Sequence, residues 1–278
     1  MNIDELIKQA LSEDIGDGDH SSLATIPKNS NGKAQLLVKE AGIISGIDIA
    51  RKVFHFVNSH IQFEQFIDEG SKVEPGDIVF LVSGKSTSLL TAERLALNYM
   101  QRMSGIATKT RFYVDLLKGL NTKVLDTRKT TPLMRQMEKY AVKTGGGENH
   151  RFGLYDMIMI KDNHIDFAGG ISKAIDATHV YLKKKSKNLK IEIEVRDFDE
   201  LQQVLDHGQV DRIMLDNFTP DDIRKALLMI NGKYETEASG GITEQSIRSY
   251  AETGVDYISV GALTHHIRSL DMSLKAID

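Results

Sequence analysis

Cysteine is absent from the 278-residue sequence. This absence excludes disulfide bonds, a thiol nucleophile and thiolate ligands for a metal ion. A chain without cysteines fits a reducing compartment, and we expect a cytoplasmic protein. Any catalysis must therefore use side chains other than thiols.

Long apolar runs and a basic excess are also missing. No apolar run approaches the roughly 18 residues that a membrane-spanning helix needs. The N-terminal segment MNIDELIKQALSEDIGDGDHSS is acidic and lacks the basic and apolar regions of a signal peptide. The net charge of -4 argues against general binding to nucleic acids or anionic membranes. We expect neither kind of partner, and a cluster of cations must therefore be local.

The first third of the chain mixes helical and strand-like patterns. Residues 3–11 have the apolar spacing of a helix, as do residues 47–57. Short strand-like runs occupy 33–46, 61–73 and 76–84. The segment 69–84 is similar to a hairpin of lipoyl- or biotinyl-like domains. It has no lysine at a clear hairpin tip to carry such a cofactor, so we interpret it as structural.

A long helical pattern follows at residues 89–119. Leu95, Tyr99 and Met103 form an apolar stripe at four-residue spacing. This stripe fits either core packing or a subunit interface. We expect Ser104 and Gly105 to interrupt the pattern and divide it into two helices.

From residue 123 short apolar strands alternate with amphipathic helices. The six strand-like runs are KVLDTR, MIMIKD, IEIEVR, RIMLDN, YETEASGG and YISVGAL, and the helical stretches lie near 132–142, 169–184, 198–207, 219–230 and 243–252. Serial βα units predict parallel strands, either in an α/β barrel or in a doubly wound open sheet. We favour the barrel because nearly every strand ends in polar or glycine residues, which a barrel gathers at one face.

These strand ends carry opposite charges. Five cations lie at or near them: Arg128, Lys129, His150, Arg151 and Lys161. Glu194 and Asp216 supply carboxylates, but Glu192 and Glu194 share a strand face, so one or both of them could instead serve the barrel interior. The last two strands end in small residues, Ser239–Gly241 and Gly261–Leu263, which allow backbone N–H groups to approach a phosphate.

Each of these residues alone is ordinary, since most strand-end cations are solvated or salt-bridged. Together they predict a site for a substrate with several negative charges and a phosphate. Arginine suits planar carboxylates because its guanidinium binds them with two hydrogen bonds. The carboxylate pair suits Mg²⁺ or sugar hydroxyls.

Several long motifs together resemble the quinolinate phosphoribosyltransferase family. They are LTAERLALNYMQRMSGIAT, DTRKTTP, EKYAVKTGGGENHRFGLYDMIMIKDNHI, LDNF and SGGIT, within a resemblance that runs from ALSEDIGDGD to SVGALTHH. The resemblance implies an incomplete parallel α/β barrel, with fewer than eight strands, preceded by an N-terminal α/β sandwich domain. We expect the sandwich at 1–110 and the barrel at 111–265, with the tail 266–278 packing on the sandwich.

The resemblance also implies an activity. The family transfers a phosphoribosyl group from 5-phosphoribosyl-1-pyrophosphate to quinolinate and releases pyrophosphate and CO2, with Mg²⁺, in the synthesis of nicotinate mononucleotide for NAD. It implies a homodimer in which Arg102 of one subunit completes the site of its neighbour, and a higher oligomer is possible. The apolar stripe near Arg102 then fits an interface.

Residue roles follow from the same resemblance. Cations around the quinolinate carboxylates and nearby phosphate oxygens are Arg102, Arg128, Lys129, His150, Arg151 and Lys161, and Thr127 also belongs to the substrate site. Glu194 and Asp216 hold the ribose hydroxyls and Mg²⁺, while Ser239, Gly240, Gly241, Gly261, Ala262 and Leu263 hold the 5-phosphate. Lys129, Lys161, Glu194 and Asp216 are the expected catalytic residues. Either Lys161 or a water molecule supplies the proton after decarboxylation.

One residue departs from the family pattern. Leu133 follows DTRKTTP where the family has glycine. With Thr131 as N-cap and Pro132 at the first helical position, we expect Leu133 in the first turn of a helix.

Two other functions remain open: phosphoribosyl transfer to another anionic base such as nicotinate, and a non-catalytic protein that binds a phosphorylated ligand or serves in assembly.

Overall fold

A computed structural model describes residues 2–277, which form two compact units. The first unit comprises the chain up to Arg111, Thr130–Gly146 and the chain from Ala262 onward. The second comprises Phe112–Lys129 and Gly147–Gly261. Within residues 2–277, every helix is too short or too polar to cross a membrane. The second unit is thus inserted into the sequence of the first.

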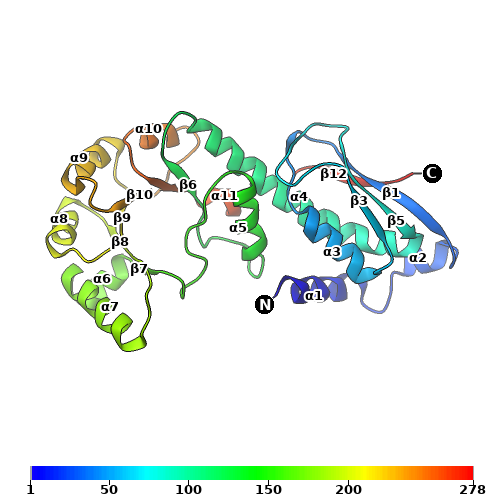
Figure 1. The fold of residues 1–278 in the computed structure, drawn as a ribbon, viewed down its shortest axis with the longest axis horizontal. Helices are drawn as coiled ribbons and strands as arrows, with labels where there is room; N and C mark the ends of the chain where they lie inside the picture. Colours follow the sequence, from blue (N-terminus) through cyan, green and yellow to red (C-terminus); the bar gives the residue numbers. More distant parts are fainter. Residues whose placement is uncertain (1, 278) are drawn as a thin grey trace. The chain divides into compact units, whose positions relative to one another are not determined.

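The first unit is built on a four-stranded antiparallel sheet (Figure 1). Its strand order is β12 (Met272–Ile277), β1 (Asn31–Val38), β5 (Ile78–Lys85) and β3 (Gln62–Gln65). The strands β2 (Gly42–Ile43) and β4 (Lys72–Val73) form a separate pair, and the helices are α1 (Ile3–Ile15), α2 (His20–Thr25) and α3 (Ile47–Val57). The C-terminal strand β12 therefore completes a sheet that begins near the N-terminus.

Helix α4 (Ser86–Leu116) is continuous, so the predicted break at Ser104 and Gly105 is wrong. Ser104 is buried, and its hydroxyl accepts a hydrogen bond from the backbone N–H of Ser45 and donates one to the Ser45 carbonyl. A side chain at Gly105 would meet the carbonyl oxygen of Arg268 at 2.3 Å. These small residues allow neighbouring backbone to pack closely against the helix and do not end it.

The second unit is a six-stranded parallel sheet, as the alternating pattern predicted. The strand order is β6 (Lys123–Leu125), β11 (Tyr257–Ser259), β10 (Glu235–Ser239), β9 (Arg212–Asp216), β8 (Ile191–Val195) and β7 (Ile158–Ile160). Its helices are α6 (Asp162–Ala168), α7 (Ile171–Lys185), α8 (Phe198–His207), α9 (Pro220–Ile230) and α10 (Ile247–Ala251), and Figure 1 shows α7–α10 outside the strands. β6 and β7 form the two edges, so the barrel is incomplete.

The turn that follows DTRKTTP differs from the prediction. Helix α5 (Arg135–Thr144) begins after Leu133, and Leu133 lies in a left-handed turn with φ of 65°. Thr131 does not cap the helix; its carbonyl accepts a hydrogen bond from Met134 N, and its N–H donates to Glu138. The prediction that Leu133 occupies the first helical turn is therefore wrong, because the loop keeps a conformation that favours glycine.

Replacing Leu133 with glycine is expected to stabilise the protein. The side chain is 66% exposed, so its removal loses little burial. Relief of left-handed strain, less the entropy that glycine adds to the unfolded chain, should raise the free energy of unfolding by about 0.5–1 kcal/mol. Urea unfolding monitored by circular dichroism tests this, with Leu133→Ala as a control that should show no gain. A destabilised glycine variant would contradict the assigned turn.

Candidate active site

The predicted site residues of the second unit lie at one edge of its sheet. Thr127, Arg128 and Lys129 follow β6, and Lys161 follows β7. Glu194 lies in β8, Asp216 and Ser239 end β9 and β10, and Gly261 follows β11. Because all six strands are parallel, these positions share the carboxyl edge. This edge is where a barrel enzyme binds its substrate.

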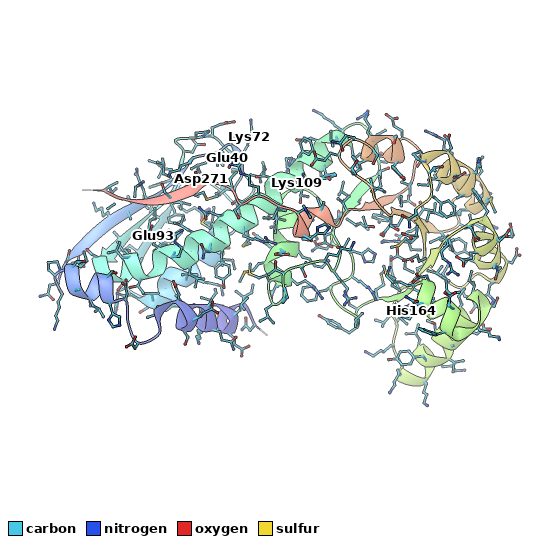
Figure 2. The ribbon with its side chains drawn as sticks, turned by 180° about the vertical axis from the view of Figure 1, so that it is seen from behind. Glu40, Lys72, Glu93, Lys109, His164 and Asp271 are labelled. Carbon is cyan, nitrogen blue, oxygen red and sulfur yellow. The ribbon has the colours of Figure 1, made fainter. Side chains whose placement is uncertain are left out.

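Lys161 and Glu194 form a direct ion pair across neighbouring strands. The ammonium nitrogen lies 2.6 Å from Oε2 of the buried Glu194. Lys161 also precedes α6, where its backbone N–H donates to Nδ1 of His164, a residue labelled in Figure 2. The backbone of Lys161 is thus fixed, and its half-exposed side chain presents a cation beside a carboxylate.

Asp216 and the Ser-Gly-Gly segment form the next part of this edge. Oδ1 of Asp216 accepts a hydrogen bond from Ser239 Oγ at 2.7 Å, and Oδ2 accepts one from Asn217 Nδ2 at 2.6 Å. A side chain at Gly240 would meet Asn217 Oδ1 at 2.2 Å. Gly240 therefore accommodates the Asn217 side chain, whereas Gly241 has open space where its side chain would be.

Arg128 and Arg151 form the cationic part of the site. Burial and the nearby charge of Arg128 lower the pKa of Arg151, as expected when two guanidinium groups approach each other. Thr127 supports the loop through its hydroxyl, which accepts a hydrogen bond from Lys129 N at 3.1 Å. Adjacent cations repel each other, so this arrangement favours an anionic ligand.

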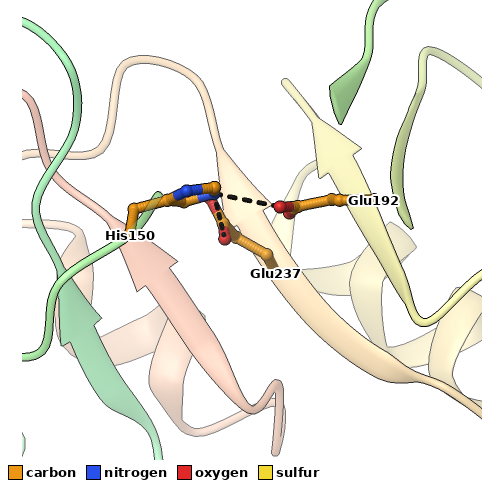
Figure 3. A group of neighbouring side chains, drawn as sticks. All are labelled: His150, Glu192 and Glu237. Carbon is orange, nitrogen blue, oxygen red and sulfur yellow. Dashed lines mark ion pairs between the residues drawn. The ribbon is translucent and has the colours of Figure 1, made fainter. Parts of the chain in front are cut away.

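His150 lies deeper than its sequence position suggested. The residue is only 8% exposed, and its Nε2 lies 3.0 Å from Glu192 Oε2 and 3.3 Å from Glu237 Oε2 (Figure 3). Both carboxylates are fully buried. Arg212 Nη1 lies 3.3 Å from the same oxygen of Glu237. We call these four residues the buried cluster.

The buried cluster retains a proton that the unfolded chain would lose. Burial opposes a charged imidazole, whereas the nearby carboxylates of Glu192 and Glu237 raise the pKa of His150. Because Nδ1 of His150 accepts a hydrogen bond from Arg151 N, the ring is neutral with its proton on Nε2, and the retained proton lies on Glu192. Burial and the charge of Glu237 raise the pKa of Glu192 to about 7. One retained proton and the Arg212 guanidinium together balance the two carboxylates. The cluster can then be buried without net charge.

A metal ion fits this cluster poorly, although ligand atoms of His150, Glu192 and Glu237 lie within 4.8 Å of one another. Nδ1 of His150 accepts a hydrogen bond from Arg151 N at 2.6 Å, which places the ring proton on Nε2, between the carboxylates. A protonated nitrogen has no lone pair for a metal. The Arg212 guanidinium also already pairs with Glu237.

Stability should fall as the pH rises. The pKa of Glu192 is raised from 4.5 to about 7, so its contribution is complete below pH 4.5 and is lost as the pH rises through 7. We expect the free energy of unfolding to decrease by about 3 kcal/mol across this window. Urea unfolding at several pH values tests this, and Glu192→Gln should flatten the dependence. A wild-type curve as flat as that of the variant would contradict the retained proton.

Arg102 belongs to the first unit, where it binds a buried carboxylate. Its Nε and Nη2 lie 3.0 and 2.8 Å from Oε1 of Glu138, which is fully buried. Nη2 also donates to Thr131 Oγ1 and to the carbonyl of Thr264. Oε2 of Glu138 accepts from Thr131 N at 3.1 Å. This set of bonds ties α4, the Thr131 loop, α5 and α11 (Ala262–His265) together.

Comparison with known proteins identifies the family. The profile of the quinolinate phosphoribosyl transferase C-terminal domain matches residues 106–275, and that of the N-terminal domain matches 19–104. The chain belongs to the quinolinate phosphoribosyltransferase family. It is 45% identical to quinolinate phosphoribosyltransferase [decarboxylating] 1b of Nicotiana tabacum, over 97% of this chain and 81% of that protein.

Bacterial members of the family are similar over nearly their whole length. The chain is 40% identical to a probable nicotinate-nucleotide pyrophosphorylase [carboxylating] of Bacillus subtilis, over 99% of this chain and 93% of that protein. The crystal structure of NadC from Streptococcus pyogenes matches with a TM-score of 0.94 and 40% identity, covering 99% of this chain and 97% of that chain. Both domains therefore follow the family fold.

The structure places most of the residues that the motifs predicted at the carboxyl edge of the sheet, with two differences. Arg128, Arg151, Lys161, Glu194, Asp216 and Ser239 lie at the carboxyl edge as predicted from sequence. His150 instead contacts the interior carboxylates, and the Leu263 side chain is buried, which leaves its backbone to meet a ligand. Three residues of this site were not predicted from the sequence: Asp126, Arg212 and Glu237. The only available signal was that Glu237 shares a strand face with Ser239, two residues later.

Proposed function

We propose that the chain transfers the phosphoribosyl group of 5-phosphoribosyl-1-pyrophosphate to quinolinate. The products are nicotinate mononucleotide, pyrophosphate and CO2, and the reaction belongs to de novo NAD biosynthesis. The observation that carries this proposal is the match to both family domains, together with a relative named for this activity that is 45% identical over 97% of the chain. The charges at the carboxyl edge are of the kind that this chemistry requires.

The acid substrate meets the cations. Four cations neutralise the two carboxylates of quinolinate and neighbouring phosphate oxygens: Arg128, Lys129, Arg151 and Lys161. Thr127 supports this group of cations. Guanidinium groups bind planar carboxylates with two hydrogen bonds, which orients the pyridine ring. A fixed orientation brings the ring nitrogen to the anomeric carbon of the sugar.

The carboxylates act at the ribose. As the ring nitrogen bonds to the anomeric carbon and pyrophosphate departs, positive charge develops on the sugar and negative charge on the leaving group. Glu194 and Asp216 hold the ribose hydroxyls and stabilise the positive centre. Lys161, 2.6 Å from Glu194, stands where it can neutralise an anion beside the sugar. The chain needs no nucleophilic side chain for this substitution.

Mg²⁺ is the proposed cofactor, held by Glu194 and Asp216. Oxygen ligands on neighbouring parallel strands suit this ion, which commonly binds one or two carboxylates together with substrate phosphates. Ser239 and Asn217 hold the carboxylate of Asp216, which gives it a defined orientation. When bound, Mg²⁺ supplies positive charge that stabilises the departing pyrophosphate.

Decarboxylation follows on the adduct. Its ring nitrogen is cationic and accepts the electrons that the carbon–carbon bond releases when CO2 departs. The chain positions and partly desolvates the carboxylate. The ring carbon then takes a proton from Lys161 or from water. The 5-phosphate is held by the backbone at Ser239, Gly240 and Gly241 and at Gly261, Ala262 and Leu263.

The functional assembly is proposed to be a homodimer in the cytoplasm. Arg102 of each subunit enters the site of its neighbour and adds a cation to the acid pocket. The Arg102 side chain is anchored by Glu138 yet 29% exposed, which supports a role in contacting a ligand. Some relatives are named as chloroplastic or mitochondrial proteins. The cytoplasmic location is therefore proposed for this chain and not for the whole family.

The decisive test is an assay with 5-phosphoribosyl-1-pyrophosphate and Mg²⁺, supplied with either quinolinate or nicotinate. We expect quinolinate to be consumed, with equal amounts of CO2 and nicotinate mononucleotide formed. Turnover of nicotinate without CO2 would favour transfer to a base with one carboxylate. The human nicotinic acid phosphoribosyltransferase shares the fold with a TM-score of 0.67 at 12% identity, so fold alone does not separate the two. No turnover by a stable protein would favour a non-catalytic role.

A further inference from the structure

The buried cluster has no direct task in the reaction described above. Its two carboxylates belong to β8 and β10, and Figure 3 shows the His150 ring pointing toward both of them from the segment that precedes β7. Burying carboxylates costs several kcal/mol each, and replacement of such a cluster with apolar residues is often neutral or stabilising. Stability therefore gives a weak reason for this arrangement, and a role in positioning explains it better.

We propose that Glu192 and Glu237 are positioning residues that act through His150 on Arg151 and thereby set the affinity for the acid substrate. The inference rests on the proposed function, because it assigns Arg151 to the pocket for the quinolinate carboxylates. It extends the site to two side chains that contact no substrate atom.

The imidazole joins the interior strands to the Arg151 backbone. On one side Nε2 reaches both buried carboxylates, and on the other Nδ1 accepts the hydrogen bond from Arg151 N at 2.6 Å. The backbone N–H of His150 is held in turn by the buried Asp126, at 2.9 Å. The ring is thus anchored at both nitrogens, and it fixes the position of the Arg151 backbone N–H.

The same segment is attached to the edge strand β6. Glu148 N donates to the Val124 carbonyl at 2.8 Å, and Asp126 N donates to the Glu148 carbonyl at 3.1 Å. These bonds extend β6 along the segment without reaching β8 or β10. His150 joins this segment to those inner strands through its ion pairs with Glu192 and Glu237. Loss of its carboxylate partners should therefore loosen Arg151 while the sheet stays intact.

Isosteric variants test the inference. Glu237→Gln and Glu192→Gln keep the side-chain shape but remove one charge each. The matched control is Glu235→Gln, on the same strand, which removes a carboxylate from Arg212 but does not contact His150. We expect the KM for quinolinate to rise at least tenfold in Glu237→Gln, and the KM for 5-phosphoribosyl-1-pyrophosphate to change less than twofold. The control should leave both values unchanged.

A second measurement does not depend on turnover. In protein labelled at histidine, NMR titration follows the His150 ring, whose signal is identified by its loss in His150→Gln. We expect the titration of His150 to move to lower pH in Glu237→Gln and to stay unchanged in Glu235→Gln. This readout reports on the contact with the carboxylate, which a general loss of packing would not shift selectively.

The outcomes separate this inference from the proposed function. A wild-type protein that releases no CO2 from quinolinate overturns the function, whereas the titration still reports on the cluster. An active wild type with unchanged quinolinate KM in both variants, or with equal rises in the two KM values, overturns the positioning role. If neither variant folds, the cluster serves stability and the inference also fails.

Discussion

Mixing an Arg102→Ala variant with a Lys161→Ala variant is expected to restore activity that neither variant has alone. Each substitution removes one cation from the proposed acid pocket. Loss of one partner of a desolvated charged pair typically costs about 2–5 kcal/mol, so each single variant should lose about 30-fold to 5000-fold in kcat/KM. These two variants should show among the largest losses of any single substitutions.

Recovery follows from the proposed sharing of sites between subunits. In a hybrid of the proposed dimer, one site has both defects and the other has neither, because each site takes Arg102 from one subunit and Lys161 from the other. After complete exchange about half of the dimers are hybrids, so the mixture should reach about a quarter of wild-type activity.

The control is a double variant, Arg102→Ala with Lys161→Ala, mixed with each single variant, which should restore nothing. Exchange itself is verified by mass spectrometry of isotopically labelled subunits. If exchange is complete and activity stays at the level of the single variants, Arg102 acts within its own subunit. The result would revise the assembly and leave the chemistry of the site unchanged.

Replacing Glu138 with alanine is expected to cause the largest loss of stability. The fully buried carboxylate accepts bonds from both Nε and Nη2 of Arg102 and from Thr131 N. Its removal leaves a partly buried guanidinium and a backbone N–H without their acceptor. Such a break costs about 3–5 kcal/mol. Urea unfolding monitored by circular dichroism measures the change.

An exposed ion pair supplies the comparison. Glu252 pairs with Arg248 on the surface at 3.1 Å, and Glu252→Ala should cost below about 1 kcal/mol. Glu138→Gln should fall between the two, since the amide oxygen still accepts hydrogen bonds from Arg102. If Glu138→Ala and Glu252→Ala destabilise the protein equally, the buried pair does not hold the Thr131 loop.

The strands of the second unit could be predicted because their signal is local. Six apolar runs, each followed by polar or small residues, match the six observed parallel strands. The same periodicity places Lys161, Glu194 and Asp216 at one edge of the sheet. The sequence also indicated that one or both of Glu192 and Glu194 could serve the barrel interior. Only the structure shows that Glu192 joins the interior cluster and that Glu194 pairs with Lys161.

What the sequence did not reveal depends on partners far along the chain. Glu237 lies 87 positions from His150 in the numbering, and no local pattern links the two. Glu138 and Arg102 are joined only by tertiary packing. The two wrong predictions have the same origin. The sequence predicted a helix break at Gly105, whereas this glycine allows the backbone of Arg268 to pack against a continuous helix. The sequence predicted Leu133 in a helix, whereas the loop holds it at positive φ.

The pairing of β12 with β1 has a consequence for how the protein is made. During synthesis β1 emerges early, yet the strand that covers one of its edges emerges only after the whole second unit. The inserted second unit is complete at Gly261, before α11 and β12 exist. Co-translational folding should therefore reverse the usual order, with the second unit folding first and the N-terminal sheet closing only once β12 has emerged.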